Sequence, residues 1–197
     1  MLAEILVLIA ISFAAPVVYL VLIRNRERYE REKWGALISA FLWGAIPAVI
    51  LSSIFEAPFQ ASLFISVVFV APFVEEFFKP LGISRRVGGE VNEVEDGIIF
   101  GVACAMGFAA VESVLYVIGA WQEYGEAVAF RTAIMRPISS VLLHASATAF
   151  TGYGISRAMV MKKSIITAAP SFLLAVLLHG WALCGGRAVS RCVRLLP

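Results

Sequence analysis

Long apolar stretches alternate with short polar connections along the chain, and six of the stretches are long enough to cross a bilayer. A membrane-crossing helix needs about 20 mostly apolar residues, because each residue adds only about 1.5 Å. Lipid offers no hydrogen-bond partner to an open backbone, so stretches of this length must be helical. The pattern predicts an all-α, polytopic membrane helical bundle of about six transmembrane helices, without a sheet, over residues 2–23, 35–54, 61–78, 97–118, 132–155 and 164–184.

Composition supports a membrane location. Hydrophobic residues make up 60% of the 197 residues and charged residues 15%, against roughly 45–50% and 25% in a soluble domain. A soluble globule of this length could not bury so much apolar surface. The net charge is only +2, so no nucleic-acid partner is expected. Because the connections are short, we expect one membrane-embedded domain over residues 1–197, a multi-pass protein of the cell membrane with the lipid bilayer as its surroundings.

Basic residues gather in alternate connections, which indicates the orientation in the membrane. They follow the first, third and fifth stretches: Arg24, Arg26, Arg28, Arg31 and Lys33; Lys79, Arg85 and Arg86; Arg157, Lys162 and Lys163. This predicts that these connections are cytoplasmic and that the N-terminus is outside. The sixth stretch should end outside, but three basic residues follow it and do not fit this orientation: Arg187, Arg191 and Arg194. Either this tail lies in the membrane interface or the number of spans differs by one.

Glu75, Glu76 and Lys79 form an EExxK pattern at the end of the third stretch. Ionisable groups inside a membrane helix are unfavourable and usually functional. Either glutamate can pair with Lys79 within one helical turn. Neighbouring residues point about 100° apart on a helix, so a helix-end ion pair explains only one of the two carboxylates. The other is a candidate general base.

The fourth stretch carries Glu112 on the same helical face as Phe108 and a glycine pair, Gly97 and Gly101, with GxxxG spacing. Such a face lets a neighbouring helix approach closely. Glu112 is therefore expected to point into the bundle. The structural alternative to a catalytic role is a hydrogen bond, for example to Arg136.

The two histidines of the chain, His144 and His179, both lie inside predicted helices. His144 shares a polar stripe with Ser140, Thr148 and Thr151, whereas His179 has apolar neighbours. Either histidine alone is explained by an interhelical hydrogen bond. Together with the glutamates they favour one cluster, which could hold a water as base and electrophile or bind a divalent metal.

Several protease classes are poorly supported. Asp96 is the one aspartate in the sequence, so a single chain cannot build an aspartyl dyad. Neither histidine begins an HExxH motif, and no GxSxG elbow is present.

The acids and histidines, in this order, resemble those of the PrsW-type intramembrane proteases, which are relatives of the CAAX prenyl proteases and the bacteriocin-processing enzymes. The similar segments are 75–79, 95–97, 107–112, 136–154 and 177–180. The resemblance covers most of the chain from about residue 20 and implies an all-helical membrane peptidase. It also implies that the catalytic residues are Glu75, Glu76, Glu112, His144 and His179. Bacterial members make the first cut in an anti-sigma factor.

The resulting hypothesis is an intramembrane endopeptidase that acts on a membrane-anchored protein. Glu75 or Glu76 takes a proton from the attacking water, with Lys79, Phe108 and Thr148 in support. His144 and His179 stabilise the oxyanion or, with Glu112, ligate a divalent metal such as zinc. Relatives often carry Asn or Asp shortly after a motif histidine, where this chain has Thr148 and Leu183.

Two other functions are left open: a small proton- or cation-coupled transporter or channel, and a non-catalytic scaffold of the same fold. Residue counting adds a geometric condition. It places Glu75 near the end of its helix and Glu112 about 20 Å deep in its own. If the two meet, the helix boundaries must be shifted, or a helix must be tilted, or the third helix must be broken near Pro72 or Pro80.

Overall fold

The computed structural model describes residues 2–27, 30–59 and 63–194, and every regular element in these ranges is a helix. Four stretches of them are long and apolar enough to cross a membrane: Glu4–Arg24, Trp34–Phe59, Val94–Tyr124 and Ile165–Leu183. The predicted helical membrane bundle is confirmed. In chain order the elements are α1 (Leu2–Arg24), α2 (Trp34–Trp43), η1 (Gly44–Ala48), α3 (Val49–Glu56), η2 (Ala57–Phe59), α4 (Leu63–Ile65), η3 (Ser66–Val70), α5 (Ala71–Phe78), α6 (Leu81–Arg86), α7 (Val94–Tyr124), α8 (Glu126–Ile138), α9 (Ser140–Val160), η4 (Ile165–Ala168) and α10 (Ala169–Arg194).

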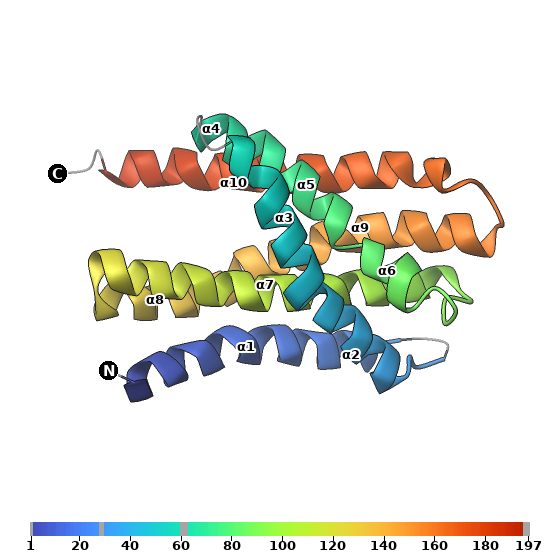
Figure 1. Cartoon of the computed structure of the whole chain (residues 1–197), viewed down its shortest axis with the longest axis horizontal. Helices are drawn as coiled ribbons and strands as arrows, with labels where there is room; N and C mark the ends of the chain where they lie inside the picture. Colours follow the sequence, from blue (N-terminus) through green and yellow to red (C-terminus); the bar gives the residue numbers. More distant parts are fainter. Residues whose placement is uncertain (1, 28–29, 60–62, 195–197) are drawn as a thin grey trace.

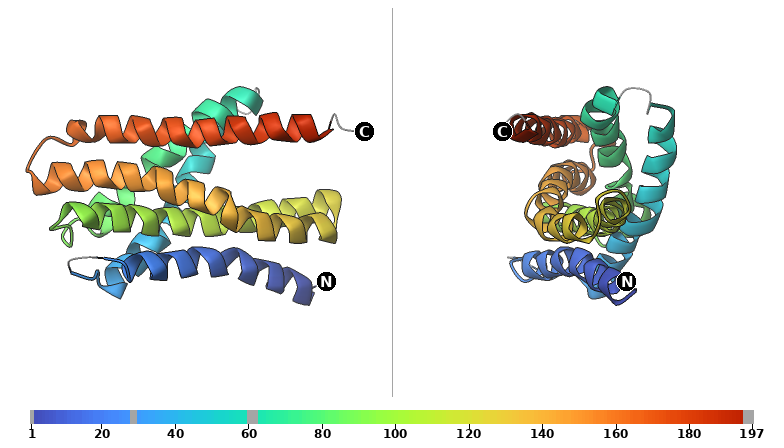
Figure 2. Two further views of the ribbon diagram at one scale, coloured as in Figure 1. Left: turned by 180° about the vertical axis from the view of Figure 1, so that it is seen from behind. Right: turned by 90° about the vertical axis from the view of Figure 1, so that its left-hand side faces the viewer.

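The long helices α1, α7, α9 and α10 run side by side, and the segments α2–α3 and α5 cross them obliquely (Figure 1). The described residues of the connections, 25–27 with 30–33, 79–93 and 161–164, lie at one end of the bundle, and both ends of the chain lie at the other (Figures 1 and 2). The three connections predicted to share one side of the membrane therefore share one end of the fold. The side chains of Arg187, Arg191 and Arg194 lie outside the described residues.

Helix α7 is the central element, and glycines let its neighbours approach it. A Cβ on Gly97 would overlap the carbonyl oxygen of Gly152 on α9. On the other side, a Cβ on Gly107 would overlap the carbonyl oxygen of Phe41 on α2. Close backbone contact of this kind is how membrane helices pack without large side chains. The GxxxG face predicted from the sequence is thus the contact between α7 and α9, the helix that carries His144.

Three of the predicted stretches are interrupted within their length: 35–54, which contains the π-helical segment η1, and those at 61–78 and 132–155. Pro72 has no N–H for the carbonyl four residues earlier, and the turn before α5 is the π-helical segment η3. The stretch predicted at 132–155 is interrupted at Ser139, whose backbone is not helical, just after Pro137. The irregularity before α5 accompanies its oblique course, and the one at Ser139 separates α8 from α9.

The end of the bundle that carries the basic connections also holds a small acidic group. The Asp96 carboxylate accepts hydrogen bonds from the backbone N–H groups of Asn92 and Glu93, at 2.8 and 2.7 Å, and so caps the start of α7. Glu32 is buried, and the Asp96 carboxylate acts on it through its charge and a hydrogen bond. Burial, followed by the negative charge of Asp96, raises the pKa of Glu32 to about 7.

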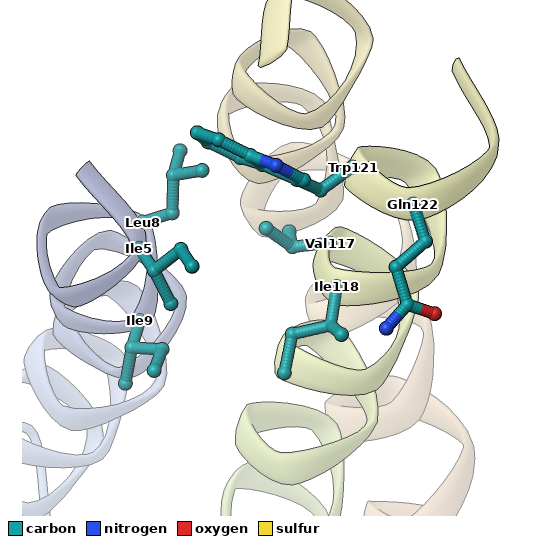
Figure 3. Close-up of a pocket in the computed structure, with 7 residues that line it drawn as sticks. All are labelled: Ile5, Leu8, Ile9, Val117, Ile118, Trp121 and Gln122. Atoms are coloured by element: carbon teal, nitrogen blue, oxygen red, sulfur yellow. The ribbon is translucent and has the colours of Figure 1, made fainter. Parts of the chain in front are cut away.

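Apolar side chains cover the outside of the bundle, while acids, histidines and hydroxyls lie inside it. Exposed examples are Val18 and Leu22 on α1 and Leu177 and Trp181 on α10. An apolar pocket between α1 and α7 (Figure 3) is lined by Ile5, Leu8, Ile9, Val117, Ile118, Trp121 and Gln122. None of the candidate catalytic residues lines this pocket.

Candidate active site

The structure brings every candidate site residue predicted from the sequence into one buried cluster. Helix α5 and the residue after it supply the EExxK side chains, α7 and α9 cross behind them, and α10 closes the cluster. The members are Glu75, Glu76, Lys79, Phe108, Glu112, His144, Thr148 and His179. The oblique course of α5 (Figure 1) meets the geometric condition set by residue counting, because Glu76 reaches Thr148 in the middle of α9 and not its end.

The ammonium group of Lys79 is at the centre. It donates to Glu75 Oε2 at 2.8 Å, to Glu76 Oε1 at 3.0 Å and to His144 Nδ1 at 2.7 Å. The side chain is fully buried, and its Nζ also lies 4.4 Å from the centre of the Phe108 ring. An ammonium has three N–H donors and no acceptor, so its hydrogen-bonding capacity is complete.

His144 links this centre to a second ion pair. Because Lys79 can only donate, His144 Nδ1 must present a lone pair, and the ring proton is on Nε2. That proton is donated to Glu112 Oε2, 2.8 Å away. Arg136 donates to the same oxygen at 2.6 Å and to the hydroxyls of Ser113 and Ser140 at 2.9 Å. The Arg136–Glu112 hydrogen bond considered as the structural alternative therefore exists, and it exists together with the His144 contact.

Glu76 is fully buried, and both of its oxygens have partners. Oε1 accepts from Lys79 and lies 3.1 Å from His179 Nδ1, and Oε2 accepts from the Thr148 hydroxyl at 2.9 Å. A carboxylate accepts hydrogen bonds, so His179 Nδ1 is the donor to Glu76 Oε1. In the neutral imidazole, Nε2 then presents a lone pair, 3.9 Å from Glu75 Oε2.

Glu75 differs from Glu76 in its partners. Its Oε2 accepts from Lys79, while Oε1 has no hydrogen-bond partner among the residues that the structure describes. The Glu75 side chain is 9% exposed, against 0% for Glu76. Within the carboxylate pair, Glu75 is the member that can reach a water molecule.

Three donor atoms face one another closely enough to hold a metal ion: an oxygen of Glu75 and one nitrogen each of His144 and His179, all within 4.8 Å. The other nitrogen of each histidine faces a carboxylate, Glu112 for His144 and Glu76 for His179. Histidines that bind metals in proteins are usually oriented in this way. The set predicted from the sequence had Glu112 in place of Glu75. In the structure Glu112 is bonded to Arg136 and to His144 Nε2.

Sequence reasoning missed one acid near the cluster. Glu56, the last residue of α3, interacts electrostatically with Glu75, Lys79 and Glu112, and its Oε1 is buried without a hydrogen-bond partner among the described residues. The second predicted stretch ended at residue 54, so Glu56 fell outside it. Its position one turn beyond an apolar run was the available signal.

An apolar groove of about 760 Å³ lies beside the cluster, between α3, α5 and α10. Val74 and Gly180 line it, and each is the immediate chain neighbour of a cluster residue, Glu75 or His179. The remaining lining is aromatic or aliphatic: Phe55, Phe59, Val68, Phe69, Val70, Phe73, Val176, Leu177 and Trp181.

Comparison with known proteins finds relatives that all carry the same name. Proteins named Protease PrsW match from Halalkalibacterium halodurans (33% identical over 164 residues, 78% of this chain and 71% of the relative) and Clostridioides difficile (32% over 146 residues, 68% and 59%). That of Oceanobacillus iheyensis is 31% identical over 153 residues, 73% of this chain and 66% of the relative. These matches cover between 59% and 71% of the relatives' own length. No solved structure matches the chain.

The sequence model of the PrsW family of intramembrane metalloproteases matches residues 32–182, which include every member of the buried cluster. The match covers more than half of the chain, and the fold is the helical membrane bundle that such a protease requires. The chain belongs to the PrsW family of intramembrane metalloproteases.

Proposed function

We propose that this chain is an intramembrane endopeptidase of the cell membrane that hydrolyses a peptide bond of a membrane-anchored protein, with Glu75 as the proton acceptor. The observation that carries the proposal is the contrast within the carboxylate pair. Glu76 is held by Lys79, His179 and Thr148, whereas Glu75 keeps one oxygen without a partner among the described residues.

The proposed proton transfer uses that oxygen. Glu75 Oε1 takes a proton from water while the water oxygen adds to the scissile carbonyl carbon. The same proton is then given to the departing amine as the C–N bond breaks. In the metal-free protein Lys79 donates to Oε2 at 2.8 Å and orients the carboxylate. Glu76 and Thr148 position Lys79 and His179 without contacting the substrate.

The histidines favour a metal-assisted version over an oxyanion hole made of imidazole donors. His144 Nδ1 presents a lone pair toward the middle of the cluster. His179 Nε2 also presents a lone pair there when His179 Nδ1 donates to Glu76. A lone pair cannot donate to an oxyanion, but it can bind a metal. Glu75, His144 and His179 would hold a divalent metal such as zinc, which when bound supplies Lewis acidity toward water and the carbonyl.

The groove beside the cluster supports the proposal that the substrate is anchored in the membrane. Its lining is apolar, and it reaches Val74 and Gly180, each next to a cluster residue. An apolar transmembrane segment of a substrate would replace lipid there without burying polar groups. Resemblance to bacterial relatives further suggests an anti-sigma factor as the substrate.

The test compares Glu75→Gln, Glu76→Gln and an exposed control, Glu123→Gln, in proteoliposomes that also contain a panel of single-pass membrane proteins. New protein termini are identified by mass spectrometry. General-base catalysis contributes about 10²- to 10⁴-fold, so Glu75→Gln should lose cleavage by that factor and unfold near the wild-type temperature. Glu76→Gln should lose both activity and stability, because three contacts of Glu76 change. Cleavage by Glu75→Gln at the wild-type rate would reject the assignment, and no cleavage by the wild type would favour a scaffold.

A further inference from the structure

The position of Lys79 relative to the three metal-binding donors suggests a second role for this side chain. Two of the donors, Glu75 Oε2 and His144 Nδ1, lie 2.8 and 2.7 Å from Lys79 Nζ and 3.7 Å from each other. His179 Nε2 is 3.9 Å from the same Glu75 oxygen. The ammonium therefore contacts two of the three donors directly, and the third lies against one of these two.

Two of the three separations are close to those of a metal centre, and all three donor atoms lie within 4.8 Å of one another. Two ligands of a tetrahedral zinc ion with bonds of about 2.0–2.1 Å are about 3.4 Å apart. The observed 3.7 and 3.9 Å are only slightly longer. A small contraction would suit the ion, but an ammonium and a metal ion cannot occupy the same position.

We propose that Lys79 is a built-in competitor for the metal: its ammonium fills the Glu75–His144–His179 site, and a divalent metal enters only when that group moves out. The inference rests on the donor set named under the proposed function. It does not depend on peptidase activity, because occupancy of the site is measured directly. In the metal-free protein Lys79 pairs with Glu75, Glu76 and His144, and Glu76 pairs with His179, so the cluster remains connected without an ion.

The first experiment measures zinc bound per chain, in detergent micelles, for the wild type, Lys79→Met and Lys79→Arg. Lys33→Met is the matched control, because Lys33 is an exposed lysine that also pairs with a glutamate, Glu90, but lies outside the cluster. Lys79→Met should bind zinc about 10- to 100-fold more tightly, the range by which neighbouring groups alter metal sites. Lys79→Arg and Lys33→Met should not gain affinity. Adding His179→Ala to Lys79→Met should remove the gain.

A second measurement uses the wild type alone and decides the matter if Lys79→Met does not fold. Lys79 is fully buried, so an amine-reactive reagent should modify it slowly, relative to Lys33 as internal reference. Zinc should accelerate modification of Lys79 and leave Lys33 unchanged. Equal zinc affinity in the wild type and folded Lys79→Met would overturn the proposal. So would wild-type modification of Lys79 that zinc does not change.

Discussion

The Arg136–Glu112 pair allows a sharp test of how the site is held together. Arg136 donates to Glu112 Oε2 at 2.6 Å and to two serine hydroxyls at 2.9 Å, and its side chain is 12% exposed. Arg136→Met removes all three hydrogen bonds and keeps much of the apolar stem. Serine hydroxyls can turn to carbonyls of their own helices. The lasting losses are the charge-assisted bond to Glu112, worth about 1.5–3 kcal/mol, and the contact of the guanidinium with the Tyr116 ring, 4.2 Å from its centre, worth about 0.5–1 kcal/mol.

We expect a coupling of about 2 kcal/mol between Arg136→Met and Glu112→Gln in a double-mutant cycle. Thermal unfolding in detergent micelles measures it. The single change Arg136→Met should lower the unfolding midpoint by about 4–8 °C, at about 2–4 °C per kcal/mol for a chain of this size. Arg131→Met, an exposed change on the same helix, should have little effect. Additive losses in the double variant would refute the reasoning, because Arg136 would then stabilise the fold without acting through Glu112.

Three further predictions concern packing, the cluster and pH. Gly152→Ala should lower stability by about 1–3 kcal/mol in thermal unfolding, because its Cβ would overlap the backbone of α7, while Gly119→Ala, which meets open space, should be neutral. Thr148→Val should reduce substrate cleavage and lower stability by about 1–3 kcal/mol, since Glu76 Oε2 loses its one hydrogen-bond donor among the described residues; Thr148→Ser should restore both. The raised pKa of Glu32, about 7, means that the folded state holds this proton more tightly than the unfolded state. Stability should therefore fall as pH rises from about 4.5 through 7, and Glu32→Gln should flatten this dependence between pH 5.5 and 8.5.

Three features could be predicted from the sequence: the helical character of the chain, the close contact made by the glycine face of α7, and the residues of the cluster. Each depended on local information. Apolar length predicts helices in lipid, glycine spacing predicts a close contact, and an acid or histidine inside an apolar helix must find an interior partner. Thr148 could be placed beside His144 because both lie on one face of a single helix.

The third donor of the candidate metal site could not be chosen from the sequence. Glu75 and Glu112 were both available, and the choice depends on how α5 crosses α7 and α9. That crossing follows the π-helical turn before Pro72, which hydrophobic periodicity does not encode. Glu56 was missed for a related reason: a residue just beyond an apolar run has no visible partner until tertiary packing brings α3 beside α5.

The cluster is a single connected network, and this has a consequence for identifying catalytic residues. Starting at Arg136, contacts pass through Glu112 and His144 to Lys79, and from there through Glu76 to His179. Removing one member leaves a neighbour with a buried unpaired group, which is destabilising whatever the chemistry. Loss of activity alone therefore cannot separate a residue that contacts substrate from one that orients another. Glu75 is the less connected of the two glutamates of the pair, because only its Oε2 is bonded, to Lys79, and Oε1 is not bonded to any described residue. A variant that loses cleavage while its unfolding temperature stays nearly constant is expected at this position first.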